Sequence, residues 1–266
     1  MKKLNKIIRN RNFYFYKLEA LNIGCWSGII SLSKKMEGDY MSEPYFRDEK
    51  FPNTQKEYVL WIDIMGTKNF MSTSLRTSSL FICKLHMAIL DARTENMHIY
   101  PVMDGAYITT NNQKDMKKFI REVFTSLGEL FIGEENPLHK FIVKGAIAYG
   151  PVVHGKDIPR DCNDEIIGNN REYMTSILLG MPMIQAVKGE KYAPPFGIYC
   201  DESVRMEEKN FSFRWYNWLS TKECRKKLLE ALIGYFNYCE NHSYKLDYDV
   251  NKIREHRKKS EEYFED

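Results

Sequence analysis

Two aspartates occupy positions within or beside apolar runs, where an acidic side chain is unexpected. Asp63 interrupts the apolar run WIDIM at residues 61–65, and Asp104 lies between two further apolar runs. If these runs form neighbouring strands, both carboxylates reach one edge of a sheet. Two buried carboxylates repel each other and lose solvation, so they require a proton or a cation. Mg²⁺ and Mn²⁺ prefer oxygen ligands, and a pair of such ions activates a hydroxyl and neutralises phosphates.

Each aspartate alone has a simpler interpretation. Asp-Gly turns are common, so Asp104 could be a solvated turn residue, and Asp63 could be a hydrogen-bonded core residue. The residues after Asp63 favour a metal and phosphate site. Gly66 ends the apolar run, and Thr67 and Lys68 begin an expected helix, where free backbone N–H groups bind phosphate oxygens and a lysine adds charge. We therefore predict Asp63 and Asp104 as metal ligands, and Gly66, Thr67 and Lys68 as substrate-binding residues.

Alternating strands and helices are expected to position these residues. A nearly continuous run of apolar, β-branched and aromatic residues predicts a central strand at 58–65. Apolar residues at helical spacing predict long helices at 67–93 and 114–131. Further strands are expected at 97–103, 106–110, 141–149 and 196–200, a helix at 171–186 despite its proline, a strand-like aromatic piece at 211–218, and helices at 221–239 and 249–264.

The order β-α-β-β-α-β-α-β predicts an α+β fold with helices against a mainly antiparallel sheet, as in ferredoxin-like or palm architectures. We expect a lead-in segment at 41–56 and a catalytic domain at 57–210. Residues 211–266 are expected to form a C-terminal strand and helical appendage of the same domain, because no linker-like stretch separates them.

Four segments resemble the class III nucleotidyl cyclases. Residues 58–71, YVLWIDIMGTKNFM, are similar to the opening F-x-D-I-x-G-F motif, and residues 100–110, YPVMDGAYITT, to the hairpin with the second metal-binding aspartate. Residues 141–155 resemble the strand with the R/K-G-x-I-x-x-G pattern, and residues 178–202 the G-x-x-x-x-x-A-x-x-L-E helix with the strand after it. The resemblance covers residues 57–264 and is nearest to the stand-alone bacterial pyrimidine cyclases of the Pycsar antiphage systems.

This resemblance implies a ferredoxin-like/palm βαββαβ core that carries out two-metal catalysis. Asp63 and Asp104 would hold two Mg²⁺ or Mn²⁺ ions, Ile64 would offer its backbone carbonyl, and Gly66 would begin the phosphate loop. An NTP, with UTP or CTP as the expected choice, would become a 3′,5′-cyclic nucleotide plus pyrophosphate, used as an antiphage signal. By the same resemblance, composite active sites would lie across a head-to-tail homodimer.

One helix departs from the family pattern. Where the family has an Asn and, four residues later, an Arg that bind ribose and phosphates, this chain has Ile184 and Lys188. Lysine supplies charge without a bidentate fork, and isoleucine cannot replace the amide. We expect Lys188 to be catalytic and Lys144 to contact the substrate, the alternative for Lys144 being a solvated strand position. Because Ile184 occupies the position of this Asn, a second function stays open: a degenerate cyclase domain that binds nucleotide or a protein partner without turnover.

A third function, a palm-fold nucleotidyl transferase acting on nucleic acid, is disfavoured by the charge distribution. Residues 1–40 hold eight Lys or Arg and three Asp or Glu, so residues 41–266 carry −2 of the chain's net +3. Without a basic stripe, no nucleic-acid partner is expected. The apolar stretch at 20–32 is too short for stable membrane insertion and lacks a cleavage site. The six cysteines are at least fifteen residues apart, which predicts reduced thiols in the cytoplasm.

Residues 37–41, EGDYM, can be encoded by GAA GGA GAT TAT ATG, a purine-rich ribosome-binding sequence ahead of a start codon. We therefore expect residues 1–40 to be translated leader, the alternative being a disordered or amphipathic basic arm. Protein expressed from its own genomic context should have the intact mass of a chain that starts at Met41. A mass that includes Met1 would contradict this hypothesis.

Overall fold

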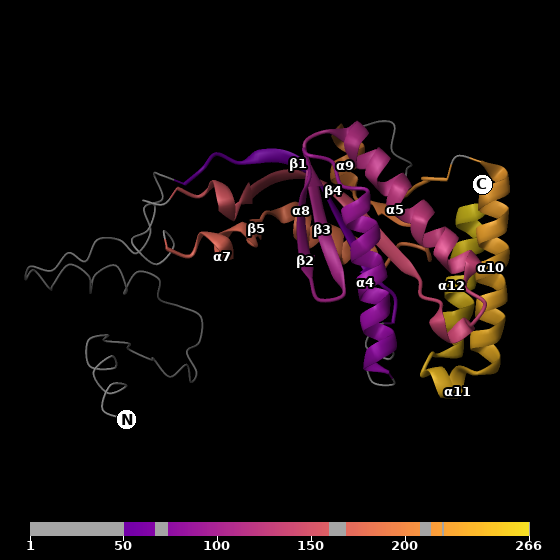
Figure 1. The fold of residues 1–266 in the computed structure, drawn as a ribbon. Helices are drawn as coiled ribbons and strands as arrows, with labels where there is room; N and C mark the ends of the chain where they lie inside the picture. Colours follow the sequence, from indigo (N-terminus) through magenta and orange to yellow (C-terminus); the bar gives the residue numbers. More distant parts are fainter. Residues whose placement is uncertain (1–50, 67–73, 160–168, 208–213, 220, 266) are drawn as a thin grey trace, which may run out of the picture. The chain divides into compact units, whose positions relative to one another are not determined.

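The computed structural model describes residues 51–66, 74–159, 169–207, 214–219 and 221–265. All of them belong to one compact unit, Phe46–Asp266. Its centre is a seven-stranded sheet with the order β2-β3-β1-β4-β6-β7, to which β5 adds by pairing with β4 (Figure 1). The strands are β1 (Gln55–Ile64), β2 (His98–Val102), β3 (Gly105–Thr110), β4 (Val143–His154), β5 (Leu178–Leu179), β6 (Ile198–Cys200) and β7 (Trp215–Tyr216).

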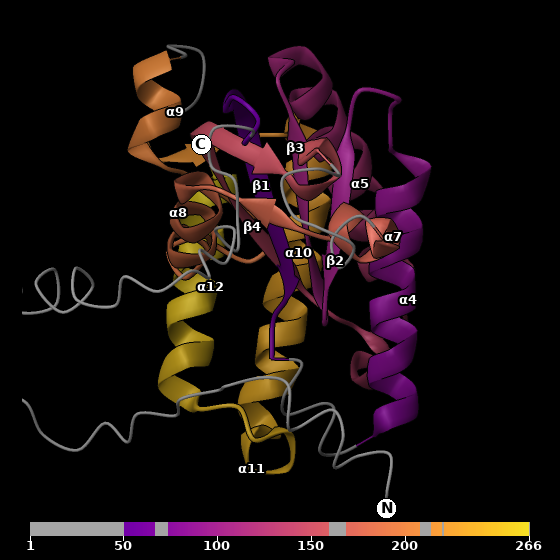
Figure 2. The same cartoon turned by 90° about the vertical axis from the view of Figure 1, so that its left-hand side faces the viewer.

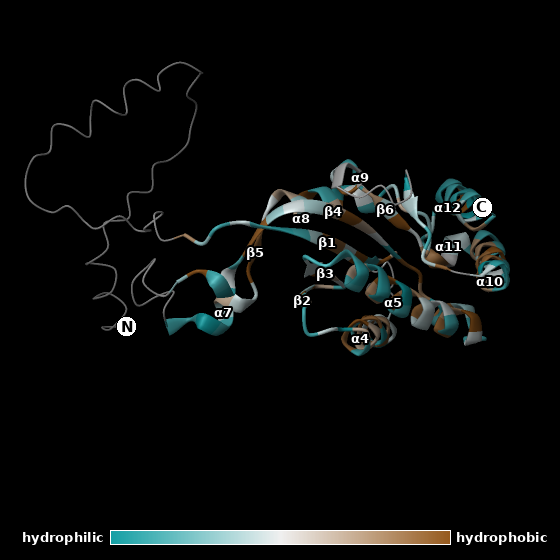
Figure 3. Ribbon diagram, turned by 90° about the horizontal axis from the view of Figure 1, so that it is seen from above, coloured by the Kyte–Doolittle hydropathy of each residue, from teal (hydrophilic) through white to brown (hydrophobic). Residues whose placement is uncertain are grey.

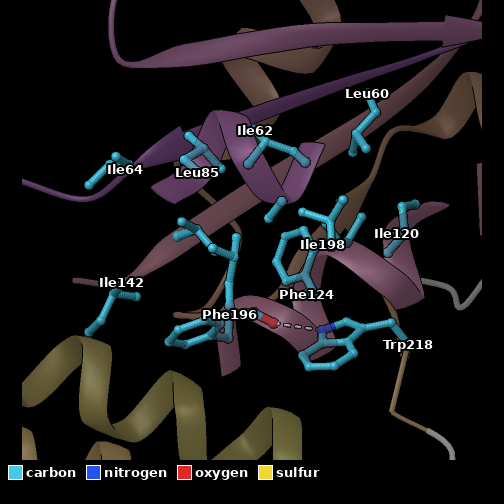
Figure 4. Packing of buried hydrophobic residues seen from close by; sticks show 14 of the residues in the cluster. Leu60, Ile62, Ile64, Leu85, Ile120, Phe124, Ile142, Phe196, Ile198 and Trp218 are labelled. Atoms are coloured by element: carbon cyan, nitrogen blue, oxygen red, sulfur yellow. Dashed lines mark hydrogen bonds between the residues drawn. The ribbon is translucent and has the colours of Figure 1, made fainter. Parts of the chain in front are cut away.

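The two faces of β1 follow from its sequence, because successive side chains point to opposite sides of a strand. Tyr58, Leu60, Ile62 and Ile64 enter the main hydrophobic core. Figure 4 shows Leu60, Ile62 and Ile64 above Phe124 and Trp218 in this core. The Trp218 indole N–H donates to the Phe196 carbonyl at 2.8 Å, which satisfies the only polar atom of that buried side chain.

Three long helices cover this face of the sheet: α4 (Leu75–Asp91), α5 (Gln113–Gly133) and α10 (Lys222–Asn241). Their buried residues recur at helical spacing, as in Phe81, Leu85 and Ile89 of α4. α4 begins where the Ser74 side chain accepts from the Thr77 backbone N–H, a typical N-cap. The core therefore lies between the sheet and these helices.

The other face of the sheet carries α8 (Met181–Glu190). Ala186 of α8 packs against Trp61 of β1 and Ala148 of β4. Viewed from above, α8 lies on the opposite side of the sheet from α4 and α5 (Figure 3). Asp63 points to the same face of the sheet as Trp61. The candidate site therefore lies on the face of the sheet that α8 covers.

The C-terminal helices belong to the main core. α10 continues through α11 (Ser243–Leu246) into α12 (Val250–Phe264), and α11 joins them at the lower end of the view in Figure 2. Phe236 of α10 and Ile253 and Phe264 of α12 are buried in the same cluster as β1. The short elements are η2 (Pro137–His139), η3 (Gly155–Asp157), α7 (Arg171–Thr175) and α9 (Glu202–Glu207).

The α+β class and the expected β-α-β-β-α-β order are confirmed, with corrections in detail. The helix expected at 171–186 is wrong: α7 ends at Thr175, β5 follows, and α8 begins after Gly180, whose φ of 151° breaks a continuous helix. Pro182 lies in the first turn of α8, where proline is tolerated. The helix expected to begin at Thr67 begins at Leu75. β4 and β6 are parallel, and α9 and α11 were not predicted.

Phe236→Ala tests whether the C-terminal helices stabilise the sheet core. Phe236 is 1% exposed, so its truncation should lower the free energy of unfolding by about 3–5 kcal/mol and leave one cooperative transition. Urea unfolding followed by both fluorescence and circular dichroism measures this. Tyr173→Ala, at an aromatic side chain that is 68% exposed, is the control and should change little. A separate early transition would show that the C-terminal helices fold independently.

Candidate active site

Asp63 is the penultimate residue of β1 and faces two neighbouring strands. Its Cα partners are Gly105 on β3 and Lys144 on β4. The strand ends at Ile64, and Gly66 follows with φ of 77°, a left-handed conformation that favours glycine. The chain therefore leaves the sheet after Met65, whose N–H still donates to the Ile142 carbonyl, at the end of the strand where Asp63 lies.

Asp104 reaches the same edge through the β2–β3 hairpin. Val102 pairs with Gly105, so the connecting residues are Met103 and Asp104 rather than the expected Asp104 and Gly105. Gly105 is required by close packing: a Cβ there would lie 2.5 Å from the Ile62 carbonyl oxygen. Because Gly105 pairs with Asp63, Asp104 lies one residue beyond the cross-strand partner of Asp63. The two carboxyl groups are close enough for the charge of Asp104 to raise the pKa of Asp63, so the expected proximity of the two aspartates is present.

The Asp63 carboxyl is held in an unfavourable electrostatic environment. Burial, which is the largest cause, and the charges of Asp104 and Glu190 together raise its pKa to about 7, against the opposing effects of the Ile64 backbone N–H and Lys144. Its Oδ1 atom is buried and has no hydrogen-bond partner within the described part of the chain. A bound cation would relieve both the burial and the repulsion.

Glu57, on the same strand and the same face, shows how a structural carboxylate is accommodated. Burial tends to raise its pKa, but His154 and Thr109 hydrogen bonds and the His154 charge lower it overall. Glu57 Oε1 lies 2.9 Å from His154 Nε2, and the Tyr100 hydroxyl contacts His154 Nδ1. Glu57 Oε2 and Asp63 Oδ1 are both buried without a hydrogen-bond partner among the described residues, so the two carboxyl groups differ in their charged neighbours: Glu57 has His154, whereas Asp63 has Asp104 and Glu190 as well as Lys144.

Lys144 belongs to the site and is paired within the chain. Its Nζ lies 2.7 Å from Glu190 Oε1, and the two side chains are only 16% and 15% exposed. The solvated alternative for Lys144 is therefore wrong. Glu190 was not singled out from the sequence, although it occupies the last position of the G-x-x-x-x-x-A-x-x-L-E pattern. α8 thus contributes a third carboxylate near Asp63.

A pocket of about 890 Å³ opens beside these residues. Asp63, Gly66, Lys144 and Glu190 line it on the sheet side. Its volume lies within the roughly 300–1,000 Å³ of small-molecule sites. The opposite wall comes from the C-terminal helices, through Tyr235, Ser243, Tyr244, Leu246, Asp247, Tyr248, Asp249, Val250, Lys252 and His256.

The remaining predicted residues lie elsewhere. Lys188 and Ile184 are on the exposed side of α8 and do not line the pocket. Ile64 lines it, whereas Asp104 interacts with Asp63 from the hairpin without lining it. Thr67 and Lys68 lie outside the described residues, as do residues 160–168. The pocket is therefore lined by Asp63, Ile64, Gly66 and Lys144 of the predicted set, and by Glu190 and the C-terminal wall, which were not predicted.

The donor set suits a hard cation that is completed by a substrate. Over the described ranges, no cluster of three or more His, Cys, Asp or Glu side chains is arranged to hold a metal ion. Mg²⁺, however, is usually bound through one or two carboxylates plus substrate phosphates and waters. The unpartnered Oδ1 of Asp63 and the nearby Asp104 match this two-carboxylate arrangement.

No protein-family model matches the chain, and no curated protein is significantly similar to it. Among solved structures, an adenylate/guanylate cyclase/hydrolase from Silicibacter pomeroyi is 13% identical with a TM-score of 0.42, over 61% of this chain and 84% of that one. The catalytic core of a rhodopsin-guanylyl cyclase in complex with ATPαS is 13% identical, with a TM-score of 0.44 over 60% and 86%. Adenylate cyclases from Trypanosoma brucei are 12% identical, with a TM-score of 0.41 over 67% and 81%. Likenesses this weak do not assign the chain to a family.

Asp63→Asn should stabilise the protein increasingly as pH rises. The folded-state pKa of Asp63 is about 7 against an ordinary value of 3.8, so the folded protein binds this proton more tightly than the unfolded chain does. The wild type therefore loses stability as pH rises from about 4 to about 7, by on the order of a few kcal/mol, and asparagine does not. Melting temperatures of both proteins between pH 4 and pH 8 measure the difference. Parallel curves would contradict the raised pKa.

Mg²⁺ or Mn²⁺ at pH 8 should raise the melting temperature of the wild type and leave that of Asp63→Asn almost unchanged, because the ion stabilises only a folded protein with an ionised site. Asp91→Asn, at an exposed aspartate of α4, is the matched control and should respond like the wild type. An equal response of all three proteins would place the ion elsewhere.

Proposed function

We propose that the chain is a class III-like nucleotidyl cyclase that converts an NTP to a 3′,5′-cyclic nucleotide and pyrophosphate. The observation that supports this most strongly is the half-buried Asp63 carboxyl group, whose Oδ1 atom has no hydrogen-bond partner, in the lining of a nucleotide-sized pocket with Asp104 nearby. The resemblance of residues 58–71 and 100–110 to the two metal-binding motifs of the cyclases concerns these same two residues.

The residues have distinct roles in this proposal. Two divalent ions bound at Asp63, Asp104 and the Ile64 carbonyl would lower the pKa of the ribose 3′-hydroxyl and offset the charge of the leaving pyrophosphate. Asp63 must be ionised to bind them. Gly66 lets the backbone approach the phosphates, and Lys144 is close enough to Asp63 to add positive charge. The reaction joins the 3′ oxygen to the α-phosphorus and breaks the bond to pyrophosphate.

The finer parts of the proposal come from the sequence resemblance. They are a pyrimidine NTP as substrate, an antiphage signal as product, and a cytoplasmic location. Within the described residues, none of the helices combines the length and apolarity needed to cross a bilayer. A head-to-tail homodimer with composite sites also belongs to the proposal, since Lys188 and Ile184 do not reach the pocket of their own chain.

A second candidate is a degenerate domain that binds nucleotide or a protein partner without turnover. Ile184 favours it, because an apolar side chain that is 48% exposed on α8 cannot orient a ribose by hydrogen bonding. The two aspartates favour an enzyme, because a domain without turnover has no need for an unpartnered buried carboxylate.

Incubation of the purified full chain with ATP, GTP, CTP and UTP in the presence of Mn²⁺ tests the proposal. A cyclic product, detected by mass spectrometry, should form from at least one NTP and predominantly from UTP or CTP. Asp63→Asn and Asp104→Asn should each lower the rate by at least about a hundredfold, beyond the roughly 10–100-fold cost of losing an outer-shell partner of a metal ligand. Asp91→Asn should have no effect.

Nucleotide binding measured on the same proteins separates the two candidates. Binding without a cyclic product from any NTP would reject the enzyme and support the degenerate domain. A cyclic purine nucleotide as the main product would retain the cyclase and reject the pyrimidine assignment.

A further inference from the structure

The ion pair between Lys144 and Glu190 forms in place of a pair between Lys144 and Asp63. Lys144 is the cross-strand partner of Asp63, so the two side chains lie on one face of the sheet. Such side chains have Cβ atoms about 4.5–5.5 Å apart, and opposite charges there attract each other. Lys144 Nζ nevertheless lies 2.7 Å from Glu190 Oε1. Within the described residues, no ion pair joins Lys144 to Asp63, and Asp63 Oδ1 has no hydrogen-bond partner.

The close approach of α8 to the sheet brings Glu190 to Lys144. A Cβ at Gly189 would lie 2.8 Å from the Tyr199 ring of β6 and 3.3 Å from the Cβ of Ala146 on β4. The last turn of α8 therefore contacts both strands only because Gly189 has no side chain. Glu190 ends the helix, where the negative end of the helix dipole disfavours an acidic residue. This position is favourable for a carboxylate when Lys144 is its partner.

Glu190 and Asp63 are the carboxylates that compete for Lys144. The charge of Lys144 lowers the pKa values of Asp63 and of Glu255 on α12. Glu255 has a partner of its own, because its Oε1 lies 2.7 Å from Lys259 Nζ and its side chain is 58% exposed. Asp63 has no such partner among the described residues, so the loss of Glu190 would leave Asp63 as the acceptor for the Lys144 ammonium.

A lysine paired with Asp63 would occupy the carboxylate that a metal ion needs. An ammonium group and a divalent cation are both attracted to the same carboxylate oxygens, so the ion would have to displace the lysine. We propose that Glu190 is a positioning residue that withholds Lys144 from Asp63 and so keeps the Asp63 carboxylate available to a divalent cation. This inference rests on the proposed function, in which Asp63 is a metal ligand, and Glu190 acts in it through Lys144.

Calorimetric titration of the full chain with Mn²⁺ at pH 8 tests the inference without nucleotide or turnover. Glu190→Gln should weaken Mn²⁺ binding about tenfold, within the range of coupling between contacting residues, because Lys144 then pairs with Asp63. In the Lys144→Met background the same substitution should weaken binding by less than about threefold, since no ammonium is released. Glu223→Gln is the matched control: Glu223 Oε1 lies 2.8 Å from Lys227 Nζ in an exposed pair that does not line the pocket.

Melting temperatures verify that each variant folds. Glu190→Asp replaces Glu190→Gln if the latter does not fold, because its shorter side chain also releases Lys144. An equal loss of affinity in both backgrounds would show that Glu190 acts only through its charge, and would overturn the inference. Mn²⁺ binding that is absent from the wild type, or unchanged by Asp63→Asn, would overturn it as well.

The same proteins separate this inference from the proposed function. A loss of Mn²⁺ affinity that depends on Lys144, in a protein that forms no cyclic nucleotide, would retain the inference and reject the cyclase. A cyclic product from a protein in which the loss does not depend on Lys144 would reject the inference and retain the cyclase.

Discussion

The candidate site depends on a carboxyl group, that of Asp63, placed in an apolar strand beside two other carboxylates. β1 is the central strand, and Asp63 pairs with β3 on one side and β4 on the other. An ionised side chain there costs free energy that the Ile64 backbone N–H and the charge of Lys144 offset only in part, because the pKa of Asp63 remains raised. Glu57, six residues earlier on the same face, is given His154. The cost at Asp63 is therefore specific to its position, and a bound cation is the simplest way to offset it.

Glycines and an ion pair around the end of β1 position the Asp63 carboxyl group. Gly105 lets β3 approach the Ile62 carbonyl closely enough for Asp104 to follow directly beside Asp63. Gly66 turns the chain away after the strand, and Glu190 holds Lys144 at the pocket wall. Together they show that the end of β1 is shaped for electrostatics and close backbone approach, while the even-numbered side chains of the same strand supply the core.

The sequence was sufficient for the features that depend on local pattern. The apolar run at 58–65, the helical spacing at 114–131 and the convergence of Asp63 and Asp104 were all predictable, because strand alternation and hairpin register are local rules. The break in the helix expected at 171–186 was not predictable, because apolar residues continue at helical spacing across Gly180. The backbone conformation of Gly180 interrupts the helix there. Glu190 and the α12 wall could not be foreseen from spacing. Lys252 is 189 residues beyond Asp63, and only the packing of α12 into the core brings the two into one pocket.

The source of positive charge for a phosphate ligand is where the fold and the sequence resemblance differ most. The resemblance places this charge on α8 at Lys188, which lies on an exposed surface and does not line the pocket of its own chain. Lys252 and His256 lie in the pocket of their own chain and need no second copy. Asp247 and Asp249 line the same wall as Lys252, so the C-terminal helices bring charges of both signs to the pocket while Ile253, Tyr263 and Phe264 of α12 pack in the main core.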